Sequence, residues 1–271
     1  MSRVEKATAN SGAECFQNDA HKYAAYLETP EGQLRFDLAF ANLREFLPQP
    51  VHSPCALDVG GGTGAAAVGL ARLGYQVTLL DSSPAMLDIA GRAAQEAGIA
   101  ERITLQHSDA SRVADLFRPG TFDVVLCHNI LEYVDAPAAV LCSAASVMRN
   151  SSAILSVLVR NQAGEALKAL VEAGDIAAAE KNLTAEWGNE SLYGSKVRLF
   201  SSTSLKAMLN AASLAVIAER GVRVVADYLP QRISLSAGYE RIFKLERVLG
   251  SRPEFAAISR YLHFLAHRPF L

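Results

Sequence analysis

The chain has 271 residues, of which 50% are hydrophobic and 20% are charged, and its formal net charge is -2. This is the composition of an ordinary globular protein, built as one large domain or as one domain with an inserted cap. It excludes a globally basic nucleic-acid binder, although a local basic face stays open. With no apolar run of about 18 residues, no signal-peptide core and no CxxC pair among its four cysteines, we expect a cytoplasmic protein with no membrane span and no metal site.

Strand and helix signals alternate over residues 55–160. Apolar runs typical of buried strands occupy 55–59, 75–81, 102–109, 122–129 and 153–159. Helical patterns lie between them, over 64–74, from Ser83-Pro84 onward and over 136–148, and an earlier helix is expected over 32–47. This alternation predicts an α/β fold, in which helices cover both faces of a parallel sheet.

The pattern changes after Arg160. Residues 161–198 contain helical stretches without a candidate for a central strand, so we expect a cap insertion, around 161–200, over the carboxyl edge of the sheet. A capped helix over 201–213, a long strand-like run over 214–229, a helix over 238–250 and a final strand over 257–269 follow. The main domain is expected to span 32–271, and 1–31 to form a segment that is partly disordered or acts as a lid.

The stretch LDVGGGTG, residues 57–64, directly follows a predicted strand. Gly60, Gly62 and Ala65 fit G-x-G-x-x-A, the dinucleotide-binding fingerprint, and Asp81 follows at the distance where an acid would bind a ribose. An enzyme that uses a nicotinamide dinucleotide is therefore one interpretation. Asp58 favours a different cofactor, one with a cationic amino-acid end, because a pyrophosphate gains nothing from an added negative charge.

Four stretches taken together, LDVGGGTG, VTLLDSSPAML, SDA and FDVVLCHNILEYVDAP, resemble the successive motifs of class I S-adenosylmethionine-dependent methyltransferases. The resemblance implies a Rossmann-like seven-stranded sheet with helices on both faces, a last strand inserted antiparallel, and a small helical cap. It also implies S-adenosyl-L-methionine as the cofactor. The implied binding residues are Gly60 and Gly61 for the methionine part, Asp81 for the ribose, Asp109 and Ala110 for the adenine, Met86 against the adenine ring, and Asp58, Gly62 and Ser82 beside them.

The flanking segments resemble a narrower family, the tRNA 5-carboxymethoxyuridine methyltransferases. The segments are TPEGQLRFDLAF (29–40), GVRVVADYL (221–229), YERIFKLE (239–246) and RYLHFLAHRP (260–269). That family methylates the carboxylate of the modified wobble uridine to its methyl ester, so the resemblance implies a tRNA partner. It also implies that Arg35 reaches the carboxylate of the cofactor and that His128 lies against the cofactor. The chain departs from the family in residues 180–198, which lack a lysine cluster, and in HKYAAYLE (21–28), which lacks an arginine.

The acceptor decides which catalytic groups are needed. A carboxylate is already ionised at pH 7 and needs no general base, but it needs a cation, for which Arg223 and Arg198 are candidates. Tyr228 or Tyr193 would donate a hydrogen bond to it. An amine or phenol acceptor would need a base, and His128 is the candidate. A methyltransferase of small metabolites and a non-catalytic cofactor-binding protein therefore stay open beside the tRNA enzyme, and neither the acceptor atom nor the oligomeric state follows from the sequence.

Overall fold

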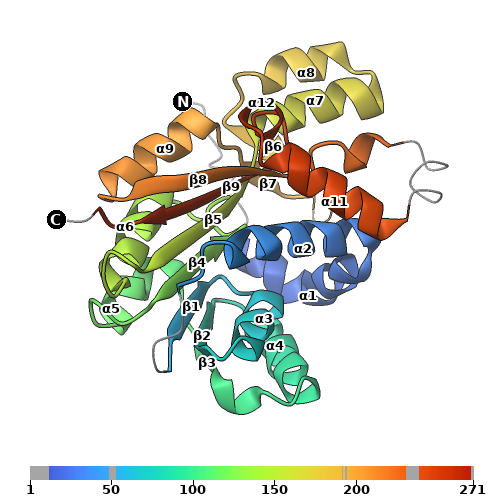
Figure 1. The fold of residues 1–271 in the computed structure, drawn as a ribbon. Helices are drawn as coiled ribbons and strands as arrows, with labels where there is room; N and C mark the ends of the chain where they lie inside the picture. Colours follow the sequence, from blue (N-terminus) through green and yellow to red (C-terminus); the bar gives the residue numbers. More distant parts are fainter. Residues whose placement is uncertain (1–11, 49–52, 191, 193, 230–237, 270–271) are drawn as a thin grey trace, which may run out of the picture.

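The computed structural model describes residues 12–48, 53–190, 192, 194–229 and 238–269 (Figure 1). The helices are α1 (Gly12–Glu28), α2 (Pro30–Arg44), α3 (Ala65–Arg72), α4 (Pro84–Glu96), α5 (Val113–Leu116), α6 (Pro137–Val147), α7 (Gln162–Ala173), α8 (Ile176–Asn182), α9 (Ser202–Ala211), α11 (Tyr239–Gly250) and α12 (Pro253–Ala256). Short 3-10 turns are η1 (Ala100–Arg102), η2 (Ala110–Arg112) and η3 (Ala226–Tyr228). The strands are β1 (Cys55–Val59), β2 (Gln76–Asp81), β3 (Ile103–His107), β4 (Val124–His128), β5 (Ile154–Arg160), β6 (Trp187–Asn189), β7 (Lys196–Arg198), β8 (Ala215–Val222) and β9 (Tyr261–His267).

The central sheet has seven strands in the order β3-β2-β1-β4-β5-β9-β8. Neighbouring strands from β3 to β5 pair in parallel, whereas β9 is inserted antiparallel between β5 and β8. The predicted seven-stranded sheet with its antiparallel last strand is thereby confirmed. The order reverses between β1 and β4, and an open α/β sheet binds its ligands at such a switch point, beyond the carboxyl ends of the strands.

Local sequence explains why these elements form where they do. Strand β5 is buried at every position, as expected for a strand covered on both faces, where an apolar run is continuous rather than alternating. Helix α4 begins after Ser83, whose side-chain oxygen accepts a hydrogen bond from the backbone N–H of Met86, and Pro84 occupies the first helical turn. Helix α2 begins in the same way after Thr29.

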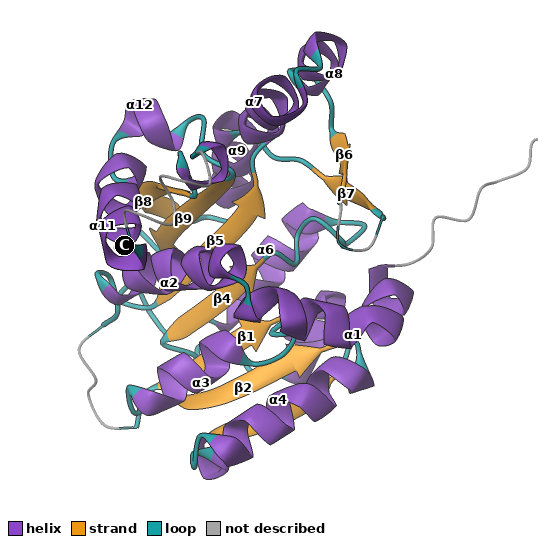
Figure 2. Ribbon diagram, turned by 90° about the vertical axis from the view of Figure 1, so that its right-hand side faces the viewer, coloured by secondary structure: helices purple, strands orange, loops and turns teal. Residues whose placement is uncertain are grey.

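Helices cover both faces of the sheet (Figures 1 and 2). One core joins the sheet to α5, α6 and α9 through residues such as Val113, Leu141 and Leu205. The other face packs against α2, α3 and α4 through residues such as Leu43 and Leu70. Helices α7 and α8 stand apart from the sheet, at the end where the parallel strands terminate (Figure 2).

Two expectations about the second half of the chain need correction. The cap is not purely helical, because β6 and β7 pair antiparallel in a small two-stranded sheet after α8. The long strand expected over 214–229 ends at Val222, because Arg223 adopts a left-handed φ of 59° that a strand does not allow. The next three backbone N–H groups then bind the buried carboxylate of Glu246 rather than a neighbouring strand.

Candidate functional site

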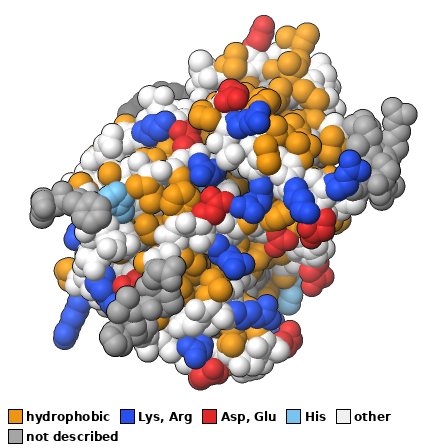
Figure 3. All heavy atoms as spheres, viewed as in Figure 1, with side chains coloured by type: hydrophobic (Ala, Val, Ile, Leu, Met, Phe, Trp, Pro, Cys, Tyr) orange, Lys and Arg blue, Asp and Glu red, His pale blue; other side chains and the backbone are white. Residues whose placement is uncertain are grey.

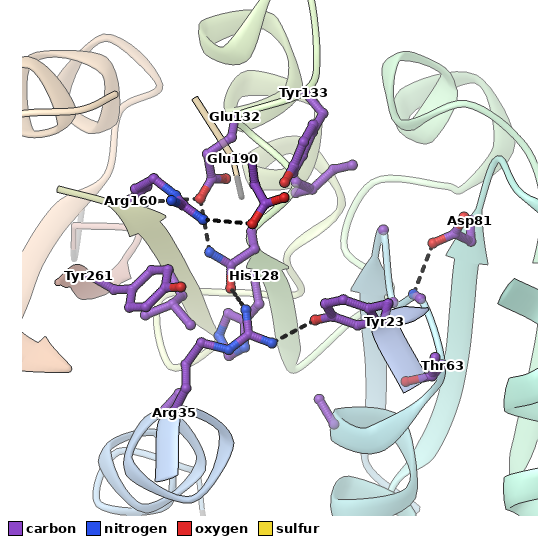
Figure 4. Close-up of a pocket in the computed structure, with 18 of the residues that line it drawn as sticks. Tyr23, Arg35, Thr63, Asp81, His128, Glu132, Tyr133, Arg160, Glu190 and Tyr261 are labelled. Atoms are coloured by element: carbon purple, nitrogen blue, oxygen red, sulfur yellow. Dashed lines mark hydrogen bonds and ion pairs between the residues drawn. The ribbon is translucent and has the colours of Figure 1, made fainter. Parts of the chain in front are cut away.

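A cavity of about 730 Å³ opens at the carboxyl ends of β1, β2, β4 and β5. The carboxyl-end residues Asp81, His128 and Arg160 are brought together there (Figure 4). The cavity is lined by almost every residue that the sequence nominated: Arg35, Asp58, Gly60, Gly61, Gly62, Asp81, Ser82, Met86, Asp109, Ala110, His128 and Arg223. The structure thus gathers residues from six separate segments of the chain around one cavity of the size that a nucleoside-containing ligand fills.

The glycine loop runs along the cavity with an unusual backbone. Gly60 and Gly62 have φ angles of 68° and 54°, a left-handed conformation that glycine adopts without strain. A Cβ atom on Gly60 would lie 2.7 Å from the Ile130 side chain, and one on Gly61 would lie 2.9 Å from Asp58 Oδ2. Both positions therefore need glycine, and the loop presents bare backbone to the cavity.

Asp81 ends β2 with its carboxylate partly satisfied by backbone groups. Its Oδ2 accepts a hydrogen bond from Gly62 N at 2.9 Å, and its Oδ1 accepts one from Ser83 N at 2.8 Å. A carboxylate offers about four acceptor sites, so these bonds leave acceptor capacity for a ligand. Burial raises the pKa of Asp81, while the backbone hydrogen bonds from Ser83, Gly62 and Ser82 act to lower it.

Asp58 lies under the same loop and is 2% exposed. Its Oδ2 is buried and has no hydrogen-bond partner in the part of the chain that the structure describes. Burial, together with the charge of Asp81, raises the pKa of Asp58 to about 7. An acid with an unsatisfied buried oxygen is a costly feature, and a cationic group in the cavity would offset that cost.

The adenine candidates lie beyond Asp81. Met86 is buried, and a Cβ atom on Gly62 would lie 4.0 Å from its sulfur, so Met86 packs directly beside the glycine loop. Asp109 precedes η2, and its Oδ1 accepts a hydrogen bond from Ser111 N at 2.8 Å. This bond caps the turn and occupies one oxygen only. Ala110 is buried behind it.

Arg35 reaches the cavity from α2 and is 6% exposed. Its guanidinium donates to Asn129 Oδ1 and to the Tyr23 hydroxyl, each at 2.8 Å, and lies over the rings of Tyr23, Tyr26 and Tyr261. No carboxylate within the described residues forms an ion pair with it. Arg35 is therefore a buried cation held by neutral partners, and its charge is available to an anion.

His128 ends β4 beside Arg35 (Figure 4). Its Nε2 lies 2.8 Å from the hydroxyl oxygen of the buried Ser156. Burial and the charge of Arg35 lower the pKa of His128 to about 3. The imidazole is therefore neutral at physiological pH.

Ion pairs hold the side of the cavity nearest the cap. Arg160 NH1 and Arg260 NH1 each lie 3.0 Å from Glu165 Oε1, and Arg160 NH2 lies 3.5 Å from Glu190 Oε1. Arg223 pairs with Asp227 and donates to the Tyr26 hydroxyl. These arginines surround Tyr261: burial acts to raise the pKa of that phenol, but the nearby positive charges lower it to about 8.

Two of the nominated side chains lie elsewhere. Arg198 stacks on the Trp187 ring, 4.5 Å from its centroid, and lines a separate small hollow. Tyr228 is in η3 and is not among the residues that line the cavity. Tyr193 lies outside the described residues.

Several residues of the site were not predicted from the sequence. Tyr23 and Tyr26 come from α1, in the segment expected to be disordered or a lid, and their spacing on one helical face was the only available signal. Asn129, Glu132 and Tyr261 also line the cavity. They lie within FDVVLCHNILEYVDAP and RYLHFLAHRP, two stretches that carry the family resemblance, but the resemblance implied no role for these three residues.

The polar groups of the cavity fit the cofactor that the resemblance implies. Asp81 keeps acceptor sites for a pair of ribose hydroxyls, Asp58 provides an unpaired acid for an ammonium group, and Arg35 provides a cation for a carboxylate. A search of the described residues finds no group of three or more metal-ligating side chains. It also finds no helix long and apolar enough to cross a membrane.

Comparison with known proteins relates the chain to methyltransferases. Residues 57–156 match the family model described as a methyltransferase domain. A tRNA 5-carboxymethoxyuridine methyltransferase of Escherichia coli K12 is 29% identical over 266 residues, which cover 94% of this chain and 96% of that protein. A ubiquinone biosynthesis O-methyltransferase of Xanthomonas euvesicatoria is 38% identical, but over 41% of this chain and 46% of that protein.

Solved structures share the fold over nearly the whole chain. The [4+2]-cyclase SpnF superposes with a TM-score of 0.66 at 17% identity, covering 96% of this chain and 95% of that one. A geranyl diphosphate C-methyltransferase of Streptomyces coelicolor, with S-adenosyl-L-homocysteine bound, superposes with a TM-score of 0.58 at 18% identity, covering 92% and 84%. Since a cyclase shares the architecture, the fold alone does not assign a reaction.

Proposed function

We propose that this S-adenosylmethionine-dependent methyltransferase methylates the carboxylate of 5-carboxymethoxyuridine at the wobble position of tRNA. The observation that carries this proposal is the similarity to the Escherichia coli enzyme over 94% of the chain. It extends through α2, the cap and α11, which lie outside the shared methyltransferase domain at residues 57–156.

We assign the cofactor to the glycine-loop side of the cavity. Asp81 would accept hydrogen bonds from the ribose hydroxyls, Asp109 and Ala110 would flank the adenine beside Ser82 and Met86, and Asp58 and Arg35 would hold the amino-acid end. When bound, the cofactor supplies an electrophilic methyl group on a cationic sulfur. The chain contributes alignment and exclusion of water, which together lower the barrier of such displacements by several kcal/mol.

A carboxylate acceptor suits the remaining groups. It is ionised at pH 7, so no side chain has to remove a proton. His128 is neutral with its pKa lowered to about 3, so it is a poor general base near neutrality. Arg223, at the cavity and held in place by Asp227 and Tyr26, is our candidate for orienting the acceptor carboxylate.

The surface chemistry bears on how tRNA would bind. Residues 219–271 carry nine Lys and Arg against five Asp and Glu, yet several of these cations are already paired. Arg220 and Arg247 share Glu45, and Arg260 faces Glu165. On the face shown in Figure 3, basic side chains alternate with acidic ones instead of forming one continuous patch. We therefore expect the protein to contact only a few phosphates of the tRNA. The logarithm of its tRNA-binding constant should then fall with the logarithm of the salt concentration, with a slope set by that small number of contacts.

The test is methylation of tRNA that carries 5-carboxymethoxyuridine. Digestion and mass spectrometry should show one added methyl group on that nucleoside, and mild alkali should remove it, since an ester hydrolyses where a methyl ether or methylamine does not. Matched controls are the same tRNA without the modification and the isolated modified nucleoside. If the free nucleoside is methylated as efficiently as the tRNA, the tRNA is not the recognised substrate.

Methylation of a small metabolite is the second candidate. It is supported by the ubiquinone O-methyltransferases, whose identity to this chain is higher but confined to 114 residues. Alkali-stable labelling of a phenolic metabolite, with no labelling of tRNA, would favour this candidate.

A further inference from the structure

Four side chains form a hydrogen-bonded row that starts at the cavity and runs across the sheet to α2. His128 Nε2 lies 2.8 Å from Ser156 Oγ, and Ser156 Oγ lies 2.7 Å from His263 Nε2. His263 Nδ1 lies 3.5 Å from Asn42 Nδ2. Ser156 and His263 are fully buried and Asn42 is 5% exposed. The four residues come from β4, β5, β9 and α2.

The direction of every bond in the row follows from Asn42. An amide nitrogen is only a donor, so Asn42 donates to His263 Nδ1, which must be unprotonated. A neutral histidine carries one N–H, so His263 carries it on Nε2 and donates it to Ser156 Oγ. The Ser156 hydroxyl then has its own hydrogen free to donate to His128 Nε2. His128 therefore carries its N–H on Nδ1.

Both rings are neutral, which this reasoning requires. Burial lowers the pKa of His263, and so do its neighbours His128 and Arg220. Burial and Arg35 lower the pKa of His128. The charged groups that face the row, Arg35 at one end and Arg220 at the other, both oppose a second proton on either ring.

We propose that Asn42, His263 and Ser156 are positioning residues, which fix His128 as the Nδ1–H tautomer and make it a hydrogen-bond donor at the cavity. Ser156 already hydrogen-bonds to Nε2 of His128. Since His128 lines the cavity, Nδ1 is the ring nitrogen that can donate to a ligand there. A fixed N–H beside the unpaired Arg35 favours an anionic oxygen, such as the carboxylate of the cofactor that we assign to Arg35. The identity of that anion rests on the proposed function, whereas the tautomer does not.

The tautomer can be measured without any substrate. The full chain, labelled with ¹⁵N-histidine, is studied at pH 7 by long-range proton–nitrogen correlation, in which the two neutral tautomers give different patterns. His128→Gln and His263→Gln assign the two signals. We expect Nδ1–H for His128 and Nε2–H for His263; His128 as the Nε2–H tautomer, or doubly protonated, overturns the proposal.

Variants of the row test its direction. Asn42→Asp replaces the terminal donor by an acceptor, so each bond should reverse and His128 should become the Nε2–H tautomer. Ser156→Ala interrupts the row, and His128 should then show a mixture of tautomers, which Ser156→Thr should restore to Nδ1–H because the hydroxyl is kept. If His128 stays purely Nδ1–H in Ser156→Ala, the row does not fix it.

Activity separates the two proposals. With tRNA carrying 5-carboxymethoxyuridine as the acceptor, Ser156→Ala should raise KM for S-adenosylmethionine several-fold more than it lowers kcat, with recovery in Ser156→Thr. If the wild-type chain does not methylate this tRNA while the spectra show the expected tautomers, the proposed substrate fails and the positioning row stands. If methylation occurs with the opposite tautomer, the row fails and the substrate stands.

Discussion

Replacing Asp81 by Asn is the sharpest test of the cofactor assignment, because the change keeps the shape of the side chain. In the wild type, each carboxylate oxygen accepts one backbone hydrogen bond, from Gly62 N at 2.9 Å and from Ser83 N at 2.8 Å. The backbone of Ser82 also hydrogen-bonds to this carboxylate. Since a carboxylate has about four acceptor sites, acceptor capacity remains for the ribose hydroxyls.

In Asp81→Asn, one of the two oxygens becomes an NH₂ group, which cannot accept from a backbone N–H or from a hydroxyl. At least one ribose bond to a charged acceptor is lost, which corresponds to about 1.5–3 kcal/mol. Since about 1.4 kcal/mol is a factor of ten in affinity, Kd for S-adenosylmethionine should rise by about ten- to one-hundred-and-fifty-fold.

Isothermal titration calorimetry with S-adenosylmethionine measures this change, and thermal unfolding checks that the variant is folded. Asp88→Asn is the matched control, because Asp88 is exposed on the adjoining helix α4 and does not line the cavity; its Kd should stay within about twofold of the wild type. A folded Asp81→Asn protein with unchanged Kd, or wild-type protein that binds a nicotinamide dinucleotide tightly instead, would refute the assignment.

Other residues give predictions that differ in kind. Burial raises the pKa of Asp58 from 3.8 to about 7, so the folded state holds this proton more tightly than the unfolded chain does. The free energy of unfolding should therefore fall as pH rises from about 4 to 7. Urea unfolding of Asp58→Asn across the same pH range should lack this decrease. His128→Gln should weaken binding of the cofactor but lower kcat on the carboxylate substrate only a little. A collapse of kcat with intact cofactor binding would instead identify His128 as a base. Arg223→Ala should abolish most activity on the modified tRNA while leaving Kd for the cofactor within about threefold, and equal loss of both would place Arg223 in the fold rather than at the acceptor. Glu246→Gln, which keeps one acceptor oxygen for a carboxylate that receives three buried backbone hydrogen bonds, should lower the free energy of unfolding by about 1–3 kcal/mol in denaturant titrations.

The sheet could be predicted from sequence because its signals are local. A strand covered on both faces is apolar at most positions, so CALDV and AILSVLV indicate β1 and β5 without knowledge of their neighbours. The cofactor residues on the glycine loop and at Asp81 are set by spacing along one βαβ unit, which is also local.

The end of β8 could not be predicted, for the opposite reason. Residues GVRVVADYL have the pattern of a continuous strand. The chain nevertheless leaves the sheet at Arg223, whose φ is left-handed, and Glu246, 22 residues after Val224, then accepts the backbone N–H of Val224. The hydrogen-bonded row behind His128 also could not be predicted, because its members are far apart in the sequence. Asn42 and His263 are 221 residues apart in the sequence, and a buried serine and a buried histidine on apolar strands look like ordinary core residues until the sheet brings them together.

The ion pairs near the cap decide which buried arginines of the cavity can bind an anion. Burying Arg160 and Arg260 around Glu165 costs desolvation that the pairing returns only in part, so such a cluster is weak evidence for stability. Its physical effect is orientation, because each guanidinium is held by a carboxylate at a fixed distance and cannot turn toward a ligand without leaving that acid unpaired. Arg35 is the contrast: it is equally buried, but its partners are an amide, a hydroxyl and three aromatic rings. An anion that approaches Arg35 therefore gains its full attraction without breaking an ion pair, which is why we assign recognition of the cofactor carboxylate to Arg35 and to the neighbouring His128.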